Sequence, residues 1–455
     1  MIDLSQPDER KQRPVSPARL AAFKILRRVD EGAFASILLA SRESRLKPSD
    51  RALCHELVMG VLRWQLWLDH LIEYLADRRV TSLDASVRIA LRLGLYQLRF
   101  LTKIPASAAV NESVNLVRLA RLRSAEGFVN AVLRRATREP EIDPSGTVTD
   151  PLVRLAIQTS HPAWLIERWI ESFGALEAEA FATANNQPAP VSFRVVPGRA
   201  TEAKVLEQLR AAGADLTASS IAKGAWRTTG GGTLLHELSQ AGKIYFQDEA
   251  SQLVAQVLNA QPGDRVLDVC SAPGSKTTQI AATSGAVRIT AADLHEHRVR
   301  TVAGAARLQD LSNIQCVVLD GEQALPFAEG SFDRVLVDAP CSGTGTLRHN
   351  PEIRWRITAE DIRHLASRQK QMLINASRMV KRGGRLVYST CSVEPEENEE
   401  VVGAFLNGNE PFVTTKLRVE SSLVTAAGYI RTWPHRDDVD GFFISVLEAQ
   451  DPWLG

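Results

Sequence analysis

Residues 265–277 have the sequence RVLDVCSAPGSKT, and this stretch decides the fold of the C-terminal half. Its apolar start predicts a buried strand over 265–269, and the residues after Gly274 are expected to open a helix. Glycine would let the backbone pass close to a ligand, and the first turn of the helix would offer that ligand free N–H groups. The loop lacks the Walker spacing, which argues against a nucleotide triphosphatase, and it also lacks G-x-G-x-x-G. The alternative is a tight strand–helix turn without a ligand.

Beyond this loop, short apolar runs alternate with helical patterns. We therefore expect a parallel, doubly wound, Rossmann-like sheet that binds ligands at the carboxyl ends of its strands. Asp293 and Asp320 fall at such ends, where the first could hold ribose hydroxyls and the second could contact an adenine. Either could instead cap a helix, but in order on successive strands they indicate a site for an adenosine. The further strand candidates are 288–292, 314–319, 334–337, 385–388 and 442–446.

Two cysteine motifs follow the next two predicted strands. Residues 338–345 are DAPCSGTG and residues 388–392 are YSTCS. Adjacent strand ends would place Cys341 and Cys391 near each other and near the cofactor. A buried thiol is usually inert packing, but two thiols at strand ends among small polar residues fit that explanation poorly.

A thiol suits methyl transfer to carbon 5 of cytosine, because that carbon is a poor nucleophile. Addition of a thiolate at carbon 6 turns the ring into an enamine whose carbon 5 can attack a methyl group. Asp338 could hydrogen-bond the ring nitrogen that gains charge. A helix expected to start at Pro395 would place its positive end near Cys391 and favour the thiolate there.

The N-terminal half has a different organisation. Residues 17–138 show apolar side chains at helical spacing with a break at Pro105, which predicts an all-helical domain. A Pro- and Asp-rich linker follows, and then a small α+β domain with a strand at 191–196, a helix at 202–212 and a turn at 230–232. The expected domains are a helical domain over 1–140, the α+β domain over 151–243, for RNA binding or linkage, and the catalytic domain over 244–455.

Charge is divided unequally along the chain. Residues 1–140 hold 24 Lys and Arg against 15 Asp and Glu, and the remainder holds 30 against 38. A basic module joined to an acidic one suggests that the first binds a polyanion such as RNA. The alternative is a helical domain with a solvated basic surface.

Composition excludes several classes of protein. The chain has 455 residues, of which 44% are hydrophobic, and no apolar run approaches the roughly 20 residues of a membrane span. The segment from Met1 to Lys11 is polar and lacks a signal-peptide core, so we expect a cytoplasmic protein without a membrane partner. Five cysteines without paired spacing argue against a disulfide framework and against zinc, and no metal is expected.

Together, the cysteine motifs and the Pro-Gly-x-Lys loop resemble the Sun family of RNA 5-methylcytosine methyltransferases. The likeness covers residues 244–447 and includes 242–251 (GKIYFQDEAS), 351–355 (PEIRW) and 394–398 (EPEEN). It implies that S-adenosylmethionine is the cofactor, that Cys391 is the nucleophile and that Cys341 assists release. The cofactor-binding residues that it implies are Cys270, Ser271, Ala272, Pro273, Gly274, Ser275, Lys276, Asp293, Asp320 and Asp338.

The chain departs from this family at a few positions. Ser271 and Ser275 replace the usual Ala and Gly, and they are small enough to keep the role of the loop. His349 stands where a second Arg is common, which leaves the detail of a possible RNA contact open. In the related DNA enzymes the Pro-Cys cysteine attacks instead, so the Thr-Cys-Ser motif indicates RNA and not DNA.

The N-terminal part resembles a NusB-like RNA-binding domain. The stretches 16–19 (SPAR), 50–53 (DRAL) and 129–133 (VNAVL) carry this likeness. Such a domain before a Sun-type catalytic domain is similar to the RsmB subfamily. The resemblance implies a monomer that methylates a cytosine in small-subunit (16S) ribosomal RNA or in an early assembly intermediate. One alternative is a transfer RNA methyltransferase, which only the NusB-like domain disfavours. The other is a non-catalytic RNA-binding or antitermination factor, which the intact cysteine motifs disfavour.

Overall fold

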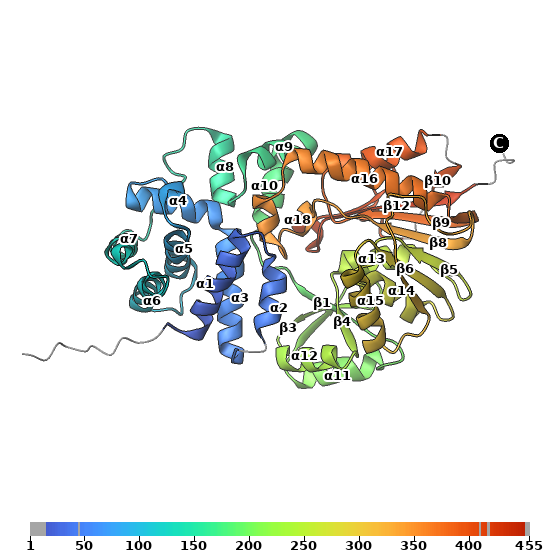
Figure 1. Ribbon diagram of the computed structural model, residues 1–455, viewed down its shortest axis with the longest axis horizontal. Helices are drawn as coiled ribbons and strands as arrows, with labels where there is room; N and C mark the ends of the chain where they lie inside the picture. The colour runs from blue at the N-terminus through green and yellow to red at the C-terminus, as the bar shows by residue number, and fades with distance from the viewer. Residues whose placement is uncertain (1–14, 44–45, 409–410, 416–418, 451–455) are drawn as a thin grey trace, which may run out of the picture. The chain divides into compact units, whose positions relative to one another are not determined.

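The computed structural model describes residues 15–43, 46–408, 411–415 and 419–450. The chain forms two compact units, one of residues up to 186 with 349–355, and one of residues 187–348 with 356–455. Figure 1 shows the elements of both. Within the described ranges, no helix is long and apolar enough to cross a membrane. The segment from Met1 to Lys11, discussed above for its lack of a signal peptide, lies outside the described residues.

The first unit is helical, as the sequence predicts. Apolar residues at helical spacing form one core that runs through the helices of the first 138 residues, with Leu57, Leu68 and Leu93 fully buried. Pro105 precedes a new helix, because its fixed φ suits a helix start. The helices are α1 (Pro17–Asp30), α2 (Ala35–Glu43), α3 (Pro48–Arg63), α4 (Gln65–Ala76), α5 (Ala85–Phe100), α6 (Ala106–Leu119) and α7 (Glu126–Arg138).

Three further helices, α8 (Pro151–Thr159), α9 (Ala163–Phe173) and α10 (Ala175–Ala184), belong to this same unit. We expected them in the α+β domain. They surround Trp169, which is fully buried against Phe181 in an edge-to-face contact.

The segment 349–355 is embedded in the helical unit, although it follows the Cys341 motif in sequence. The Arg354 guanidinium is fully buried and donates to Asn186 Oδ1 at 2.8 Å and to the Ser160 carbonyl at 3.1 Å. Glu352 is also buried and accepts from the Ala35 N–H at the start of α2, at 2.7 Å. The conspicuous PEIRW motif thus forms part of the core of this unit.

The second unit begins with a four-stranded antiparallel sheet in the order β2-β3-β1-β4. Two helices pack on it around Phe193 and Leu209, both fully buried. Its fourth strand lies past the boundary that we expected at Lys243. The elements are β1 (Val191–Val195), α11 (Glu202–Ala211), β2 (Asp215–Ala218), β3 (Ala225–Thr229), α12 (Gly232–Gln240) and β4 (Ile244–Phe246).

The larger sheet has the order β10-β12-β9-β8-β5-β6-β7, with β11 paired to β12. Strands β5 to β9 are parallel, which confirms the Rossmann-like fold. At one edge β12 runs antiparallel to β9, so the sheet is mixed and not wholly parallel as expected. The strands are β5 (Arg265–Asp268), β6 (Arg288–Asp293), β7 (Ile314–Val318), β8 (Phe332–Asp338), β9 (Val380–Thr390), β10 (Phe412–Thr414), β11 (Ile430–Thr432) and β12 (Phe442–Ala449).

Helices cover both faces of this sheet (Figure 1). Side chains alternate between the faces along each strand, so neighbours such as Leu336 and Val337 enter different cores. One core lies under α13 (Glu249–Val257) and α14 (Ser275–Thr283), with α15 (Glu296–Leu308) beside α14. The other lies under α16 (Ala359–Ser377) and α17 (Glu399–Leu406).

Candidate functional site

The loop after β5 has the conformation that its sequence predicts. Gly274 has a φ of +103° and directly precedes α14. An added Cβ at Gly274 would lie 3.3 Å from the Val302 backbone on α15. Glycine is therefore required by its left-handed conformation and by the packing of α15, in addition to any ligand. Ser271 ties the loop to β6, because its hydroxyl donates to the Ala292 carbonyl at 2.8 Å.

Acidic side chains lie along the carboxyl edge of the sheet. Asp293 ends β6, is buried, and accepts from the Ala272 N–H of the loop at 3.3 Å. Asp320 follows β7 and is partly exposed. At the end of β5, Asp268 is buried with one carboxylate oxygen that lacks a hydrogen-bond partner among the described residues. Burial raises the pKa of Asp268 to about 7.

These residues fit the adenosine-containing cofactor that the resemblance implies. Carboxylates at the ends of neighbouring parallel strands, beside a loop that enters a helix, suit ribose hydroxyls and a polar ligand. The unpartnered oxygen of Asp268 is an acceptor at the foot of this loop. Cys270 packs in the core beside Met372, with 3.9 Å between their sulfur atoms.

The two motif cysteines lie together, as expected from adjacent strand ends. The Sγ atoms of Cys341 and Cys391 are 3.4 Å apart, and both side chains are partly accessible. The hydrogen bond with Cys391 raises the pKa of Cys341 well above its ordinary value, and burial and the nearby charge of Glu397 raise it further. This shift favours the thiol form of Cys341, and either sulfur atom can be the donor in the contact between them.

A buried ion pair lies beside the thiols. Lys276 Nζ is 2.6 Å from Asp338 Oδ2, and the Ser389 hydroxyl donates to the other oxygen of Asp338 at 2.7 Å. Burial lowers the pKa of Lys276, but the charge and hydrogen bond of Asp338 outweigh it, so the pKa ends above its usual value. Lys276 stays an ammonium group. The contact of Ser389 with Asp338 could not be predicted from the sequence, because a serine inside a strand has no distinctive spacing.

The two cysteine loops approach each other too closely to admit a side chain at Gly345. The Gly345 N–H donates to the Cys391 carbonyl at 2.9 Å, and the Gly441 N–H donates to the Gly345 carbonyl at 2.8 Å. A Cβ at Gly345 would lie 1.9 Å from the Gly441 carbonyl oxygen. The glycine of the Ser-Gly-Thr-Gly segment is thus required by the close approach of three backbones.

The helix expected at Pro395 starts later. Residues Pro395–Glu397 form a short 3-10 turn, and α17 begins at Glu399. The backbone of Asn398, with ψ of −99°, separates the two. The argument that a helix end at Pro395 favours the Cys391 thiolate is therefore wrong. Lys276 lies close enough to Cys391 for the two side chains to interact electrostatically.

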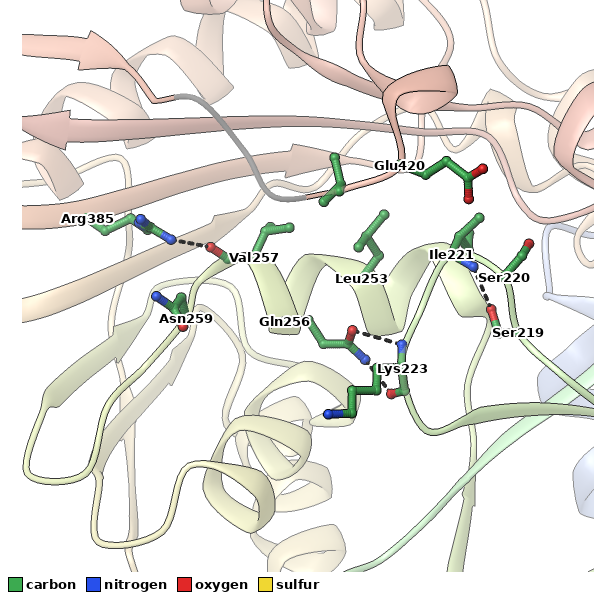
Figure 2. A pocket seen from close by; sticks show the side chains of 11 residues that line it. Ser219, Ser220, Ile221, Lys223, Leu253, Gln256, Val257, Asn259, Arg385 and Glu420 are labelled. Carbon is green, nitrogen blue, oxygen red and sulfur yellow. Dashed lines mark hydrogen bonds between the residues drawn. The ribbon is translucent and has the colours of Figure 1, made fainter.

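A cavity of about 900 Å³ lies away from the cysteines. Arg385, in the middle of β9, lines it, whereas Cys391 directly follows the end of that strand. Figure 2 shows Arg385 donating to the Val257 carbonyl and Gln256 bonded to the backbone of Lys223. The residues that line this cavity come from the domain of the smaller sheet and from the catalytic domain, and none of them is an expected site residue.

Family models match most of the chain. The model described as 16S rRNA methyltransferase RsmB/F matches residues 255–448. The NusB family model matches residues 16–138. A model for the ferredoxin-like domain of RsmF/B-like methyltransferases matches residues 161–230.

Whole proteins show the same similarity. The probable ribosomal RNA small subunit methyltransferase B of Bacillus subtilis is 34% identical, over 92% of this chain and 95% of that protein. The ribosomal RNA small subunit methyltransferase B of Pseudomonas putida is 37% identical, over 94% of this chain and 98% of that protein. The solved structure named PH0851 is 26% identical with a TM-score of 0.82, and the match covers 96% of this chain and all of that one.

Proposed function

The chain belongs to the RsmB/F family of 16S ribosomal RNA methyltransferases, which use S-adenosylmethionine, and from this premise we propose the atom that it methylates and the residue that attacks. The proposed product is 5-methylcytosine, formed through a covalent bond between Cys391 and the cytosine. The observation that carries the proposal is the pair of thiols, whose sulfur atoms lie 3.4 Å apart at the ends of neighbouring parallel strands. Lys276, which interacts electrostatically with Cys391, lies beside this pair of thiols.

The reaction begins with addition of Cys391 Sγ to carbon 6 of the ring. This bond gives carbon 5 the electron density of an enamine. S-adenosylmethionine, when bound, supplies the methyl group that carbon 5 takes. Water then takes the proton from carbon 5, the electrons of that C–H bond re-form the C5–C6 double bond, and the carbon–sulfur bond breaks, which restores the aromatic ring and the free thiolate. Cys341, 3.4 Å from the leaving sulfur, is placed to assist this last step.

Asp338 and Lys276 act on the cytosine ring in this proposal. Addition at carbon 6 places negative charge on a ring nitrogen, and a carboxylate alone only accepts hydrogen bonds. Lys276 keeps its proton, and its positive charge, with Nζ 2.6 Å from Asp338 Oδ2, would stabilise the negative charge that develops on the ring beside that carboxylate. The expected contact between Asp338 and the ring therefore depends on Lys276.

The RNA substrate is 16S ribosomal RNA or an early assembly intermediate, in line with the names of the relatives. The excess of basic residues in 1–140 supports RNA binding there, and we assign 151–243 to RNA binding or linkage and 244–455 to catalysis. We further propose that the enzyme acts as a cytoplasmic monomer and does not act on DNA.

Bisulfite sequencing tests this function. In a strain that lacks the gene, one cytosine of 16S ribosomal RNA should lose its protection from bisulfite conversion. The wild-type gene should restore that protection and a Cys391→Ala gene should not. A 16S ribosomal RNA with unchanged methylcytosines in the deletion strain would refute the proposal, and loss of a transfer RNA signal would favour the alternative substrate.

A further inference from the structure

The segment 394–398, EPEEN, has no role in the chemistry above, but it lies against both cysteine loops. Its last two residues, Glu397 and Asn398, are fully buried. The Tyr388 hydroxyl donates to the Glu397 carbonyl at 2.6 Å and fixes this turn to the end of β9. The side chains of Glu397 and Asn398 therefore extend from a backbone that is fixed next to the two cysteine loops.

Glu397 holds the Cys341 loop from both sides of the cysteine. After Cys341, the Ser342 N–H donates to Glu397 Oε1 at 2.8 Å, and the Ser342 hydroxyl donates to the other oxygen. Before Cys341, the Pro340 carbonyl accepts from Gln369 Nε2 at 2.9 Å, and the same amide group donates to Glu397 Oε1 at 2.9 Å. The carboxylate of Glu397 thereby fixes the backbone on which Cys341 is carried.

Asn398 holds the Cys391 loop in the same way. The Thr390 hydroxyl, before Cys391, donates to Asn398 Oδ1 at 2.5 Å. Asn398 Nδ2 donates to the carbonyl of Ser392, after Cys391, at 2.9 Å. One amide group therefore uses both its acceptor and its donor to bracket the cysteine.

We propose that Glu397 and Asn398 are positioning residues with separate duties, Glu397 for the releasing thiol Cys341 and Asn398 for the attacking thiol Cys391. The inference rests on the proposed function, because it assigns each residue through the role of its cysteine. Neither side chain touches the reacting atoms. Because the two residues are consecutive, one rigid turn sets the distance between the thiols.

The two duties predict opposite effects on the covalent intermediate. Without the Glu397 carboxylate, the Ser342 N–H and the Gln369 amide lose an acceptor, and so does Ser392, which also bonds Glu397. Asn398 still brackets Cys391, so we expect Cys341 to be displaced more than Cys391. We expect Glu397→Ala to slow release by at least about tenfold and to accumulate protein bound to RNA. In Asn398→Asp an oxygen replaces the donor that faces the Ser392 carbonyl. We expect it to slow adduct formation by at least about tenfold without accumulation.

The experiment incubates the full-length protein with 16S ribosomal RNA and S-adenosylmethionine. The RNA-bound fraction is measured on a denaturing gel, and the methyl groups transferred in the first turnover are counted. Glu397→Gln keeps one acceptor oxygen and should behave more like wild type than Glu397→Ala. Glu400→Gln, at an exposed position on α17, is the matched control and should change nothing. Should Glu397→Ala fail to fold by thermal melting, Glu397→Asp, which withdraws the carboxylate by one methylene group, tests the same bond.

The pattern of results decides between the inferences. Accumulated adduct with Glu397→Ala and reduced adduct with Asn398→Asp supports separate duties. If both variants lose adduct and turnover in parallel, the proposal of separate duties is overturned, and Glu397 and Asn398 share only a structural role. Cys341→Ala is run beside them: if it traps RNA while Glu397→Ala does not, this inference fails alone. If Cys341→Ala traps no RNA either, the failure lies in the proposed function, because Cys341 would then have no role in release of the adduct.

Discussion

The anchoring of segment 349–355 in the helical unit makes a specific prediction about Arg354. Its guanidinium is fully buried, and the partners that the structure describes for it include carbonyl and amide oxygens. Burial lowers its pKa to about 9, below the usual value for arginine. Arg354→Ala removes the donors and leaves the oxygens of Ser160 and Asn186 inside the unit without them.

The size of the effect follows from the shorter hydrogen bonds. The bonds to Asn186 and Ser160 measure 2.8 and 3.1 Å, whereas those to Asn185 and Arg63 are longer, at 3.3 and 3.4 Å. A buried acceptor left without its donor costs about 1–3 kcal/mol, so two of them cost about 2–6 kcal/mol. Local opening of the segment should become easier by this amount.

Hydrogen exchange measured by mass spectrometry reports this opening directly. Peptides that cover 349–355 should exchange at least about thirtyfold faster in Arg354→Ala, which corresponds to the lower end of the range. Peptides that cover β5 should exchange as in the wild type, because β5 belongs to the other unit. Local exchange is preferable to a melting temperature here, since a chain of several domains need not unfold in two states.

Arg363→Ala is the matched control, because Arg363 is exposed on α16 and should leave the segment unchanged. Unchanged exchange at 349–355 in Arg354→Ala would refute the reasoning. It would mean that the buried guanidinium does not hold the segment.

Three further predictions concern the catalytic unit. Burial raises the pKa of Asp268 from 3.8 to about 7, so the folded state binds more protons than the unfolded state between these values and loses stability as pH rises through them. Asp268→Asn should therefore melt higher than wild type at pH 8, with the gap closing toward pH 4, and an equal gap at both pH values would contradict this. Gly345→Ala should lower both melting temperature and activity, because its Cβ would lie 1.9 Å from the Gly441 carbonyl oxygen, and full activity would show that the loops can separate. Asp293→Ala should weaken S-adenosylmethionine binding in calorimetric titration, and unchanged affinity would remove Asp293 from the cofactor site.

The parts of the fold that follow from local pattern could be predicted from the sequence. Apolar runs bounded by turn residues predicted β5 to β9 and β12, and the Pro-Gly loop predicted the start of α14. Short elements gave no such signal. Strand β11 spans only Ile430–Thr432 and exists because it pairs with β12, which local sequence does not encode.

The start of α17 was missed for a related reason. Pro395 with two following glutamates is typical of a helix start, but the chain makes a 3-10 turn there. The turn is fixed by long-range bonds, such as those of Glu397 to Ser342 and of Asn398 to Thr390. Tertiary hydrogen bonds thus override the local preference.

The proximity of the two motif cysteines could be predicted from the sequence, but the residues that hold their loops could not. The proximity of Cys341 and Cys391 follows from adjacent parallel strands, which pattern alone can predict. Gln369 could not be found, because a glutamine in the middle of a helix has no distinctive spacing. Arg354 was noted for its motif, but its burial in the other unit depends on how the chain folds back.

Trapping of the covalent adduct shows whether Cys391 attacks and Cys341 assists release. Wild-type protein, the two Cys→Ala variants and the double variant are each incubated with 16S ribosomal RNA and S-adenosylmethionine, then run on a denaturing gel. We expect Cys341→Ala to accumulate protein bound to RNA. This complex should be absent from Cys391→Ala and from the double variant, because a residue that acts earlier masks one that acts later. A complex trapped only when Cys391 is replaced would show that the roles of the two thiols are reversed.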